Sequence, residues 1–392
     1  MAKKEFSFAD LDKQLSKIEG FELGSILEEN DFSEVSEWIS LGNYLLNAQV
    51  SGSLFGGVPN NRSMGIAGDP ATGKTFVCMN IVREAQKMDY DVIYCDTEGA
   101  IDRTMAKKFG IDTNRVRYQP IKGINDFKIF VTNLVDMVKS ARKQGNFLKI
   151  MVILDSLGML TTDKEVSDAL KGKSVMDMGL RSKEMRALFR AITLDLTGVK
   201  IPLICTNHTT TAGIGSFITS KEASGGDGPI FSMSNVIMLS KAQLKENDTK
   251  TGIIVTSTPK KVRFTRPYPV KFHISFMNGM NPYVGLQDFV SWENCGIQRG
   301  KLEEDKKTKE LIFTAVDSSP RWAIKHLGKT VPSSQLFTPE VFTPEVLKEL
   351  DEKVIKPHFL LPDLFDEKEF NDLLNQNEEN EEQITEDGEG EA

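Results

Sequence analysis

A glycine-rich stretch at 68–75, GDPATGKT, has the residue types and spacing of a loop that binds phosphate groups. Its lysine would bring a positive charge to the β- and γ-phosphates, and its last threonine offers a hydroxyl ligand to Mg²⁺. Glycines at its two ends allow positive φ angles and a close approach of backbone N–H groups to the phosphates. The residues predicted to bind the nucleotide are Gly68, Asp69, Pro70, Ala71, Thr72, Gly73, Lys74 and Thr75.

The segments that flank this stretch match the strand and the helix that such a loop connects. RSMGIAG, at 62–68, is a short extended run that ends in the first glycine. On the other side, Val77, Ile81 and Ala85 recur at helical spacing with polar residues opposite. This context favours a nucleoside triphosphatase over a chance glycine turn followed by a lysine.

Three further apolar runs predict the strands of a parallel sheet. They are YDVIYCDTE at 90–98, LKIMVILDS at 148–156 and KIPLICTNH at 200–208. Each run ends in polar residues and follows a helical pattern long enough for a crossover. Because ligands bind beyond the carboxyl ends of such strands, the polar residues there are the candidate site.

Each of these strand ends carries one candidate functional side chain. Asp155 is predicted to bind the magnesium ion of the nucleotide, directly or through water. Glu98 is the candidate for orienting the attacking water, with an ordinary surface carboxylate as the alternative. His208 is placed to touch the γ-phosphate, although a lone histidine is usually only a hydrogen-bonded polar residue.

Two long polar stretches follow the second and third of these runs. TTDKEVSDALKGKSVMDMG lies at 161–179, and the Gly-, Ser- and Thr-rich TTTAGIGSFITSKEASGGDGPIFS lies at 209–232. Loops of this length inside a domain are functional or disordered. Two mobile, lysine-bearing loops at one edge of the sheet suggest a polymeric ligand whose binding is coupled to ATP.

A basic helical face follows the first of these stretches. Lys183, Arg186 and Arg190 recur at i, i+3 and i+7 in LRSKEMRALFRAI. This face could track the phosphates of a nucleic acid. A plain solvated face is the competing interpretation.

Composition excludes several classes of protein. No run approaches the roughly 18 apolar residues of a membrane span. The N-terminus lacks the apolar run of a secretory signal. Four scattered cysteines (Cys78, Cys95, Cys205 and Cys295) read as reduced core residues and not as disulfides or metal ligands. A cytoplasmic protein without a membrane partner is expected, in the host cell cytoplasm if a phage encodes it.

Charge is divided unevenly along the chain. The segment 363–392 holds 13 acidic residues and one lysine, so the rest of the chain is mildly basic although the whole chain carries −8. Such an acidic tail is too polar to bury a core and is expected to be disordered. It either serves solubility or competes with DNA phosphate for a basic channel.

The ordered set of motifs GDPATGKT, YCDTEGAID, VILDSLGML, MGLRSKEMRALFR, ICTNH and GGDGP resembles the core of RecA-type strand-exchange recombinases. It is similar in particular to the UvsX-type recombinases of T-even-type phages. The resemblance covers 39–290 and is far more specific than the phosphate loop alone. It implies an ATPase that forms a helical filament on DNA, with ATP at the interface between subunits.

The resemblance also assigns roles to individual residues. It implies that Glu98 is the catalytic carboxylate and that His208 is a sensor linking the γ-phosphate to the second DNA-binding loop. Lys261 and Arg263, in STPKKVRF, match a basic pair that reaches into a neighbour's nucleotide. Met105 stands where the family places a tyrosine against adenine, and a thioether can pack on that ring with less π overlap. The implied DNA-binding residues are Met178, Gly179, Lys183, Arg186, Arg190, Phe217, Lys221, Gly225 and Gly226.

The predicted fold class is α/β, with a RecA-like P-loop ATPase core and a mostly parallel central sheet. We expect an N-terminal helical oligomerisation segment at 1–38, the ATPase and DNA-binding core at 39–290, a small helical C-terminal region at 291–362 and the disordered acidic tail at 363–392. The N-terminal segment would dock on the adjacent subunit, because heterologous contacts that repeat without closing build a filament.

These observations predict an ATP- and Mg²⁺-dependent DNA recombinase that pairs single-stranded DNA with homologous duplex DNA in recombination, repair and recombination-dependent replication. Its expected partners are further copies of itself, a single-stranded-DNA-binding protein and a recombination mediator. A RecA-fold replicative helicase is the alternative, but it should show a separate N-terminal domain. A non-catalytic DNA-coating protein would not need Lys74, Glu98 and Asp155 together.

Overall fold

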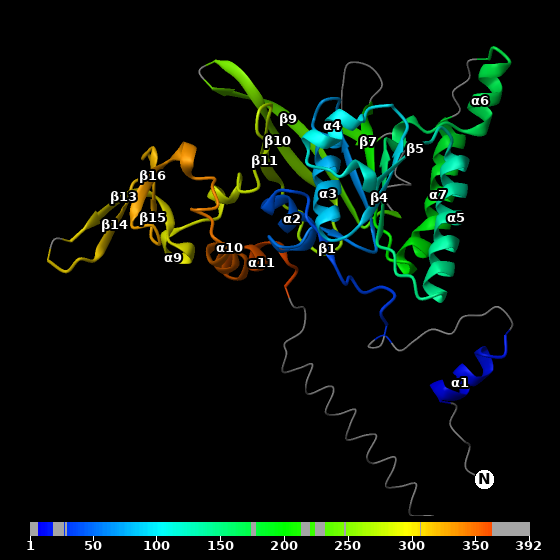
Figure 1. The fold of residues 1–392 in the computed structure, drawn as a ribbon, viewed down its shortest axis with the longest axis horizontal. Coiled ribbons are helices and arrows are strands. Elements are labelled where there is room, and N and C mark those ends of the chain that lie inside the picture. Colours follow the sequence, from blue (N-terminus) through cyan, green and yellow to red (C-terminus); the bar gives the residue numbers. More distant parts are fainter. Residues whose placement is uncertain are drawn as a thin grey trace, which may run out of the picture. The chain divides into compact units, whose positions relative to one another are not determined.

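The fold is described from a computed structural model of the chain (Figure 1). The structure describes residues 7–18, 27, 30–173, 178–212, 220–223, 232–246, 248–305 and 307–362. The acidic tail at 363–392 therefore lies outside the described residues. The chain divides into two units, each assembled from separate segments.

The first unit contains a parallel sheet with helices on both faces. It comprises Met1–Ile39, Val58–Gly68 and Lys74–Ser234. Its elements are α1 (Phe8–Leu15), β1 (Trp38–Ile39), β2 (Val58–Pro59), β3 (Ser63–Gly68), α3 (Lys74–Lys87), β4 (Asp91–Asp96), α4 (Arg103–Lys108), η2 (Thr113–Arg115), β5 (Val116–Pro120), α5 (Ile124–Lys143), β6 (Ile150–Asp155), η3 (Leu157–Met159), α6 (Asp163–Leu170), α7 (Met178–Gly198), β7 (Leu203–Ala212) and β8 (Ser220–Ala223).

The sheet of this unit runs in the order β3-β7-β6-β4-β5, and every neighbouring pair in it is parallel. Right-handed crossovers place α3 and α4 on one face and α5 and α7 on the other, because the two pairs of connections run in opposite directions across the sheet. Figure 1 shows α5 and α7 side by side. The predicted parallel α/β core is confirmed.

The register of the strands sets which polar residues meet at the carboxyl edge. Gly68 at the end of β3 is level with His208 on β7, and Asp96 at the end of β4 is level with Asp155 at the end of β6. Strands β3 and β6 are buried along almost their whole length on both faces of the sheet, so a one-residue slip would exchange side chains between two close-packed faces and disrupt the core. Hydrophobic burial therefore fixes the alignment of the functional residues.

The two long polar stretches contain more regular structure than the sequence predicts. In the first, Asp163–Leu170 forms α6, which begins with a capping box between Thr162 and Glu165. In the second, β7 extends to Ala212 and pairs with β8. The prediction that 161–179 is a loop throughout is wrong, because the Thr-x-x-Glu capping signal starts a helix there.

The second unit contains an antiparallel sheet followed by a small C-terminal assembly. It comprises Ser40–Gly57, Asp69–Gly73 and Asn235–Ala392. Strands β9 and β10 form a long hairpin, and β11 and β12 continue the sheet in the order β9-β10-β11-β12. Its elements are α2 (Tyr44–Ser51), β9 (Asn235–Glu246), β10 (Thr249–Lys261), β11 (Val270–Ser275), β12 (Gly279–Met280), η4 (Leu286–Asp288), α9 (Trp292–Cys295), β13 (Ile297–Glu304), β14 (Leu311–Ala315), β15 (Arg321–Ile324), β16 (Lys329–Pro332), η5 (Ser333–Gln335), α10 (Pro344–Leu350), η6 (Asp351–Ile355) and α11 (Lys356–Phe359).

The C-terminal region is not only helical, as the sequence predicts, but contains a four-stranded antiparallel sheet. Its strand order is β14-β13-β15-β16, and α10 and α11 follow it. The strands are short and partly exposed, and β14 has no buried residue, so they lack a clear apolar alternation. Helix α10 begins at Pro344, with Thr343 as N-cap.

Two predictions about composition can be compared with the described residues. All four cysteines are buried and free. None of the described helices is long and apolar enough to cross a membrane. The N-terminal segment contributes α1, an eight-residue helix that buries none of its side chains and is capped by Ser7.

A buried glutamine on α2 fixes the position of β10, the strand that ends in Lys261. The Gln49 amide donates to the carbonyls of Ser257 (3.0 Å) and Tyr268 (2.8 Å), and its oxygen accepts from the Ser257 hydroxyl (2.5 Å). We expect Gln49→Leu to lower the free energy of unfolding by about 1–3 kcal/mol, because it leaves these buried groups without a partner. Denaturant unfolding of the variant measures the loss.

The exposed Gln243 on β9 provides the matched control. Gln243→Leu makes the same chemical change at the surface and should leave the free energy of unfolding within about 0.5 kcal/mol of the original protein. Equal stability of both variants would contradict the structural role of Gln49.

Candidate nucleotide-binding and hydrolytic site

The predicted phosphate loop lies between a strand and a helix, as its chemistry requires. Gly68 is the last residue of β3, and Lys74 is the first residue of α3. Positive φ angles occur at Ala71 (59°) and Gly73 (94°) and not at Gly68, which stays extended because it is paired in the sheet. Of the two terminal glycines, only Gly73 therefore adopts the positive φ that glycine allows. The loop leads directly into the N-terminus of α3, the end of a helix at which backbone N–H groups bind anions.

The two polar side chains at the end of the loop occupy defined positions. The Lys74 side chain is largely buried, and its Nζ atom donates to the Gly68 carbonyl at 2.9 Å, so the ammonium folds back across the loop. The Thr75 hydroxyl donates to Oδ2 of Asp155 at 2.9 Å. The predicted pair Thr75 and Asp155 is thus brought together from α3 and β6.

The donor set of this pair suits magnesium. Mg²⁺ prefers oxygen ligands in an octahedral arrangement, in which two adjacent ligands lie about 3 Å apart. Asp155 is 3% exposed, and the hydroxyl of Thr75 lies on its carboxylate. Thr75 and Asp155 are therefore the residues that would hold the metal together with nucleotide phosphates.

Glu98 and His208 meet at the same edge of the sheet, as predicted. Nε2 of His208 lies 2.8 Å from Oε1 of Glu98. The Ser156 hydroxyl donates to the same oxygen at 2.5 Å. Ser156 is itself held by Thr97, whose hydroxyl accepts from the Ser156 N–H at 2.7 Å. One carboxylate oxygen is thus held by two partners.

The surroundings of Glu98 keep its carboxyl ionised. Burial alone would raise the pKa of this carboxyl, but hydrogen bonds from Ser156 and His208 and the charges of His208 and Lys74 outweigh that effect. The pKa of Glu98 therefore lies below its ordinary value. At neutral pH the group is a carboxylate, which is the state that accepts a hydrogen bond from an attacking water.

A buried aspartate shapes the turn that carries Glu98. Oδ1 of Asp96 accepts from the N–H groups of Glu98 (2.9 Å) and Gly99 (2.8 Å), and Oδ2 accepts from Ile101 at 3.4 Å. Three backbone donors are thereby satisfied by one carboxylate at the end of β4. This arrangement holds the Glu98 turn against the strand.

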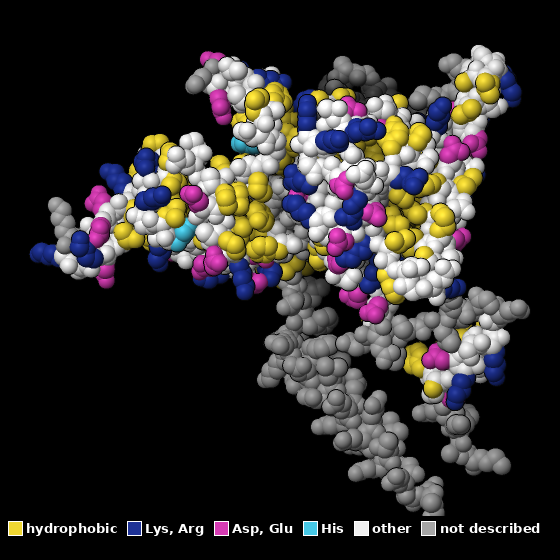
Figure 2. Space-filling model, viewed as in Figure 1, with side chains coloured by type: hydrophobic (Ala, Val, Ile, Leu, Met, Phe, Trp, Pro, Cys, Tyr) yellow, Lys and Arg dark blue, Asp and Glu magenta, His cyan; other side chains and the backbone are white. Residues whose placement is uncertain are grey.

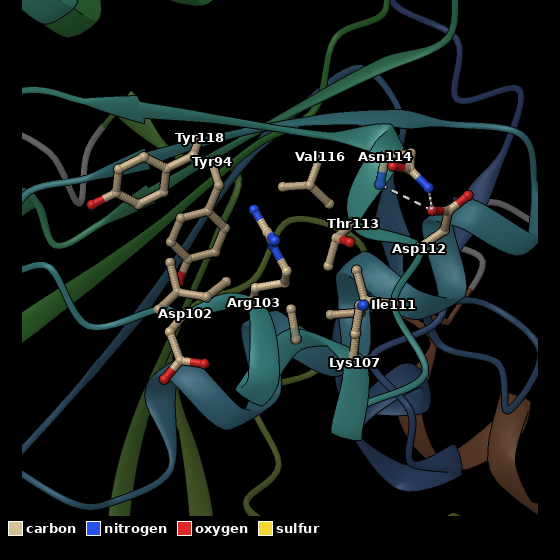
Figure 3. A pocket seen from close by; sticks show the side chains of 12 residues that line it. Tyr94, Asp102, Arg103, Lys107, Ile111, Asp112, Thr113, Asn114, Val116 and Tyr118 are labelled. Carbon is tan, nitrogen blue, oxygen red and sulfur yellow. Dashed lines mark hydrogen bonds between the residues drawn. The ribbon is translucent and has the colours of Figure 1, made fainter.

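A cavity of about 660 Å³ lies between α4 and the strands β4 and β5. Figure 3 shows the Arg103 side chain reaching into it between Tyr94 and Val116. Figure 2 shows further Lys and Arg side chains over α4, which ends in Lys107 and Lys108. Met105, the predicted adenine contact, is half-buried on α4 and does not line this cavity, and its role stays a prediction.

The two cations predicted to act on a neighbour's nucleotide belong to the second unit. Lys261 is the last residue of β10 and is half-buried. Arg263 lies two positions further along the chain and is exposed, and its backbone N–H donates to Oδ1 of Asn235 at 3.3 Å. Burial and repulsion by Arg263 both lower the pKa of the Lys261 ammonium below its ordinary value. Two cations held side by side in this way are stabilised by an arriving anion.

The predicted DNA-binding residues are only partly described. Lys183, Arg186 and Arg190 are all exposed on one face of α7, so the basic helical face exists. Met178 and Gly179 form the first turn of that helix, and Lys221 lies on β8. Phe217, Gly225 and Gly226 lie outside the described residues.

Several residues of the site were not identified from the sequence. They are Tyr94, Asp96, Thr97 and Ser156, at or within two residues of the carboxyl end of a strand, and Thr206, which lies within β7 two residues before His208. The sequence signal that could have identified them is their position close to Glu98, Asp155 or His208 along the chain. Their partners depend on the register between strands that are distant in the sequence.

Comparisons with known proteins agree with this geometry. The family described as RecA N-terminal domain matches residues 9–281. The chain is similar to the "Recombination and repair protein" of Enterobacteria phage T4, with 26% identity over 344 residues, which cover 85% of this chain and 84% of the relative. It is also similar to "Protein RecA" of Paenarthrobacter aurescens, with 27% identity over 357 residues and 90% of both chains.

The hydrogen bond from Ser156 gives a testable pH dependence. Ser156→Ala removes a donor that lowers the pKa of Glu98, so that pKa should rise. Because the ionised form is the active one, the acid limb of the pH–rate profile for nucleotide hydrolysis should move to higher pH. Steady-state hydrolysis between pH 4 and pH 8, roughly the range around an ordinary glutamate pKa, measures the change.

Thr161→Ala is the control, since the Thr161 hydroxyl donates to the Lys122 carbonyl at 3.1 Å and does not touch Glu98. Its pH–rate profile should match that of the original protein. An unmoved acid limb in Ser156→Ala would show that Glu98 does not govern it.

Proposed function

Because the chain belongs to the RecA N-terminal domain family, we propose that it is an ATP-dependent DNA recombinase that polymerises on single-stranded DNA and catalyses homologous pairing and strand exchange. The observation that carries the proposal is the joint presence of the phosphate loop, the Thr75–Asp155 pair and the Glu98–His208 pair at one sheet edge. A DNA-coating protein without hydrolysis has no use for this set. Recombination, repair and recombination-dependent replication are the processes it would serve.

Each residue of this set has a role in phosphoryl transfer. The loop N–H groups and Lys74 bind and orient the phosphates. Mg²⁺, held by Thr75 and Asp155, supplies neutralising charge when bound. Glu98 orients the attacking water, and His208, which lies on the same carboxylate, senses whether the γ-phosphate is present. Met105 would pack on the adenine ring.

DNA would bind beyond the carboxyl edge of the sheet. The exposed face of α7 with Lys183, Arg186 and Arg190 is suited to phosphate contacts. Gly179 and Met178 begin that helix, and the segment after Asp155 that includes α6 would carry nucleotide-driven movement to it. His208 has a similar path along β7 to the second predicted DNA-binding segment, with Phe217, Lys221, Gly225 and Gly226.

The remaining partners follow from the filament. Lys261 and Arg263 would complete the site of an adjacent subunit, which makes hydrolysis depend on assembly. A single-stranded-DNA-binding protein and a mediator would act on the same DNA. For a phage-encoded protein the place of action is the host cytoplasm.

Two substitutions test the catalytic assignment. Lys74→Ala should abolish ATP hydrolysis, because the phosphates lose their buried cation. Glu98→Gln should retain ATP binding and lower kcat by about 10²–10⁴-fold, because the water loses its acceptor. ATP turnover with and without single-stranded DNA measures both effects, and turnover by the original protein should require the DNA.

Lys260→Ala serves as the control for loss of a surface cation, since Lys260 is exposed on β10. Its turnover should equal that of the original protein. Robust hydrolysis by Glu98→Gln would remove Glu98 from the catalytic role. DNA-independent turnover by the original protein would contradict the proposed coupling.

A mixing experiment tests whether subunits share the site. Protein carrying Lys261→Ala and Arg263→Ala is combined with Lys74→Ala protein on single-stranded DNA. Each alone should be nearly inactive, whereas mixed filaments contain interfaces where an intact phosphate loop faces intact cations. Recovered ATP hydrolysis above the sum of the two measures those interfaces.

Electron microscopy of the same samples verifies that both variants assemble. If both form filaments and the mixture hydrolyses no more ATP than its parts, the assignment of Lys261 and Arg263 across the interface is wrong. Closed rings in place of open helices would favour a helicase.

A further inference from the structure

Three hydroxyl groups surround the carboxylate of Asp155. Oδ2 accepts from Thr75 at 2.9 Å and from the Tyr94 hydroxyl at 2.7 Å, and Oδ1 accepts from the hydroxyl of Thr206. Asp155 is 3% exposed, and Tyr94 and Thr206 are fully buried. Thr75 belongs to the phosphate loop, whereas the other two hydroxyls do not.

Tyr94 and Thr206 reach Asp155 from the strands on either side of it. Asp155 ends β6, whose neighbours are β4, which carries Tyr94, and β7, which carries Thr206. An ionised carboxylate only accepts hydrogen bonds, so both hydroxyls must donate to it. Neither donor can be removed without leaving a polar atom in a buried place.

These contacts determine how the carboxylate is turned. The χ2 angle of aspartate is broad, so its rotamer alone does not fix the plane of the carboxylate relative to the phosphate loop. A donor on each oxygen does fix it. Partners of this kind around a metal-binding carboxylate set the affinity for the metal, and losing one typically costs about 10–100-fold.

The ring of Tyr94 lies between the cavity and the core of the sheet. It lines the 660 Å³ cavity, and Figure 3 shows the Arg103 side chain between it and Val116. Cross-strand packing supports it from β5, where Tyr118 is its direct partner in the register. At its buried end the ring carries the hydroxyl that donates to Asp155.

We propose that Tyr94 and Thr206 are positioning residues that hold the Asp155 carboxylate in the orientation that binds the divalent cation. The inference rests on the proposed function, because it assigns the cation site to Thr75 and Asp155. It adds two residues that touch neither the nucleotide nor the metal. They act on the metal through Asp155.

The test measures metal binding without turnover. Tyr94→Phe and Thr206→Val each remove one hydroxyl and keep the side chain volume nearly unchanged. Binding of Mn²⁺ in the presence of ADP, followed by electron paramagnetic resonance, should weaken about 10-fold in each variant. ADP binding in EDTA, which depends on the phosphate loop, should stay unchanged. Thr206→Ser retains the hydroxyl and should restore the Mn²⁺ affinity.

Two buried residues provide matched controls. The hydroxyl of Tyr90 donates to Glu37 at 2.6 Å, and that of Thr197 donates to the Thr193 carbonyl at 2.9 Å. Tyr90→Phe and Thr197→Val make the same chemical changes away from Asp155. They should lose stability without losing Mn²⁺ affinity.

The possible outcomes distinguish failure of the positioning role of Tyr94 and Thr206 from failure of the proposed function. Wild-type Mn²⁺ affinity in both Tyr94→Phe and Thr206→Val overturns the positioning role and leaves the proposed function intact. Equal weakening in the controls also overturns it, because the effect would then follow from general destabilisation. Failure of the original protein to bind Mn²⁺ with ADP would instead contradict the proposed function. If Tyr94→Phe does not fold, the contrast between Thr206→Val and Thr206→Ser decides.

Discussion

The structure of the site depends on the parallel register of five strands. That register brings Gly68 level with His208 and Asp96 level with Asp155, so residues more than 50 positions apart in the sequence end at one edge. No individual hydrogen bond at that edge could impose the alignment. It follows from the apolar side chains that β3 and β6 bury on both faces of the sheet, because a slip of one residue would disrupt their close packing. The chemistry at the edge is thus stabilised by packing beneath it.

Two carboxylates beside the site show how the edge divides its tasks. The Asp96 carboxylate accepts hydrogen bonds from backbone N–H groups and shapes the Glu98 turn. The Asp155 carboxylate instead accepts hydrogen bonds from side-chain hydroxyls. Backbone donors cannot move without unfolding the turn, while a hydroxyl such as that of Thr75 can rotate toward a ligand. The first carboxylate is structural and the second remains available to a cation.

The sequence was most informative where local chemistry and local pattern coincide. The phosphate loop, the polar residues Glu98, Asp155 and His208 at one edge of the sheet and the basic face of α7 could all be predicted. The roles of Tyr94 and Thr206 could not be predicted, because each lies within a mostly apolar strand and its hydrogen-bond partner, Asp155, lies on a different strand. Helix α6 begins with a capping box, a local signal that the polar composition of the stretch concealed. The strands of the sheet β13–β16 are too short and too exposed to show an alternation of apolar and polar residues. The roles of the catalytic and DNA-binding residues remain predictions.

The phosphate loop also joins the two units through the chain. Gly68 and the residues from Lys74 onward belong to the first unit, while Asp69–Gly73 groups with the second. Within the second unit, the Lys241 ammonium on β9 donates to the carbonyl of Pro70, a residue of the phosphate loop, at 2.8 Å. The partner of β9 in the hairpin is β10, which ends in Lys261. The hairpin that carries the cations proposed for a neighbour's nucleotide is therefore bonded to the loop that binds its own. In the proposed filament, an event at the subunit interface and one at the phosphate loop would share this two-stranded element, which is what coupling of hydrolysis to assembly would require.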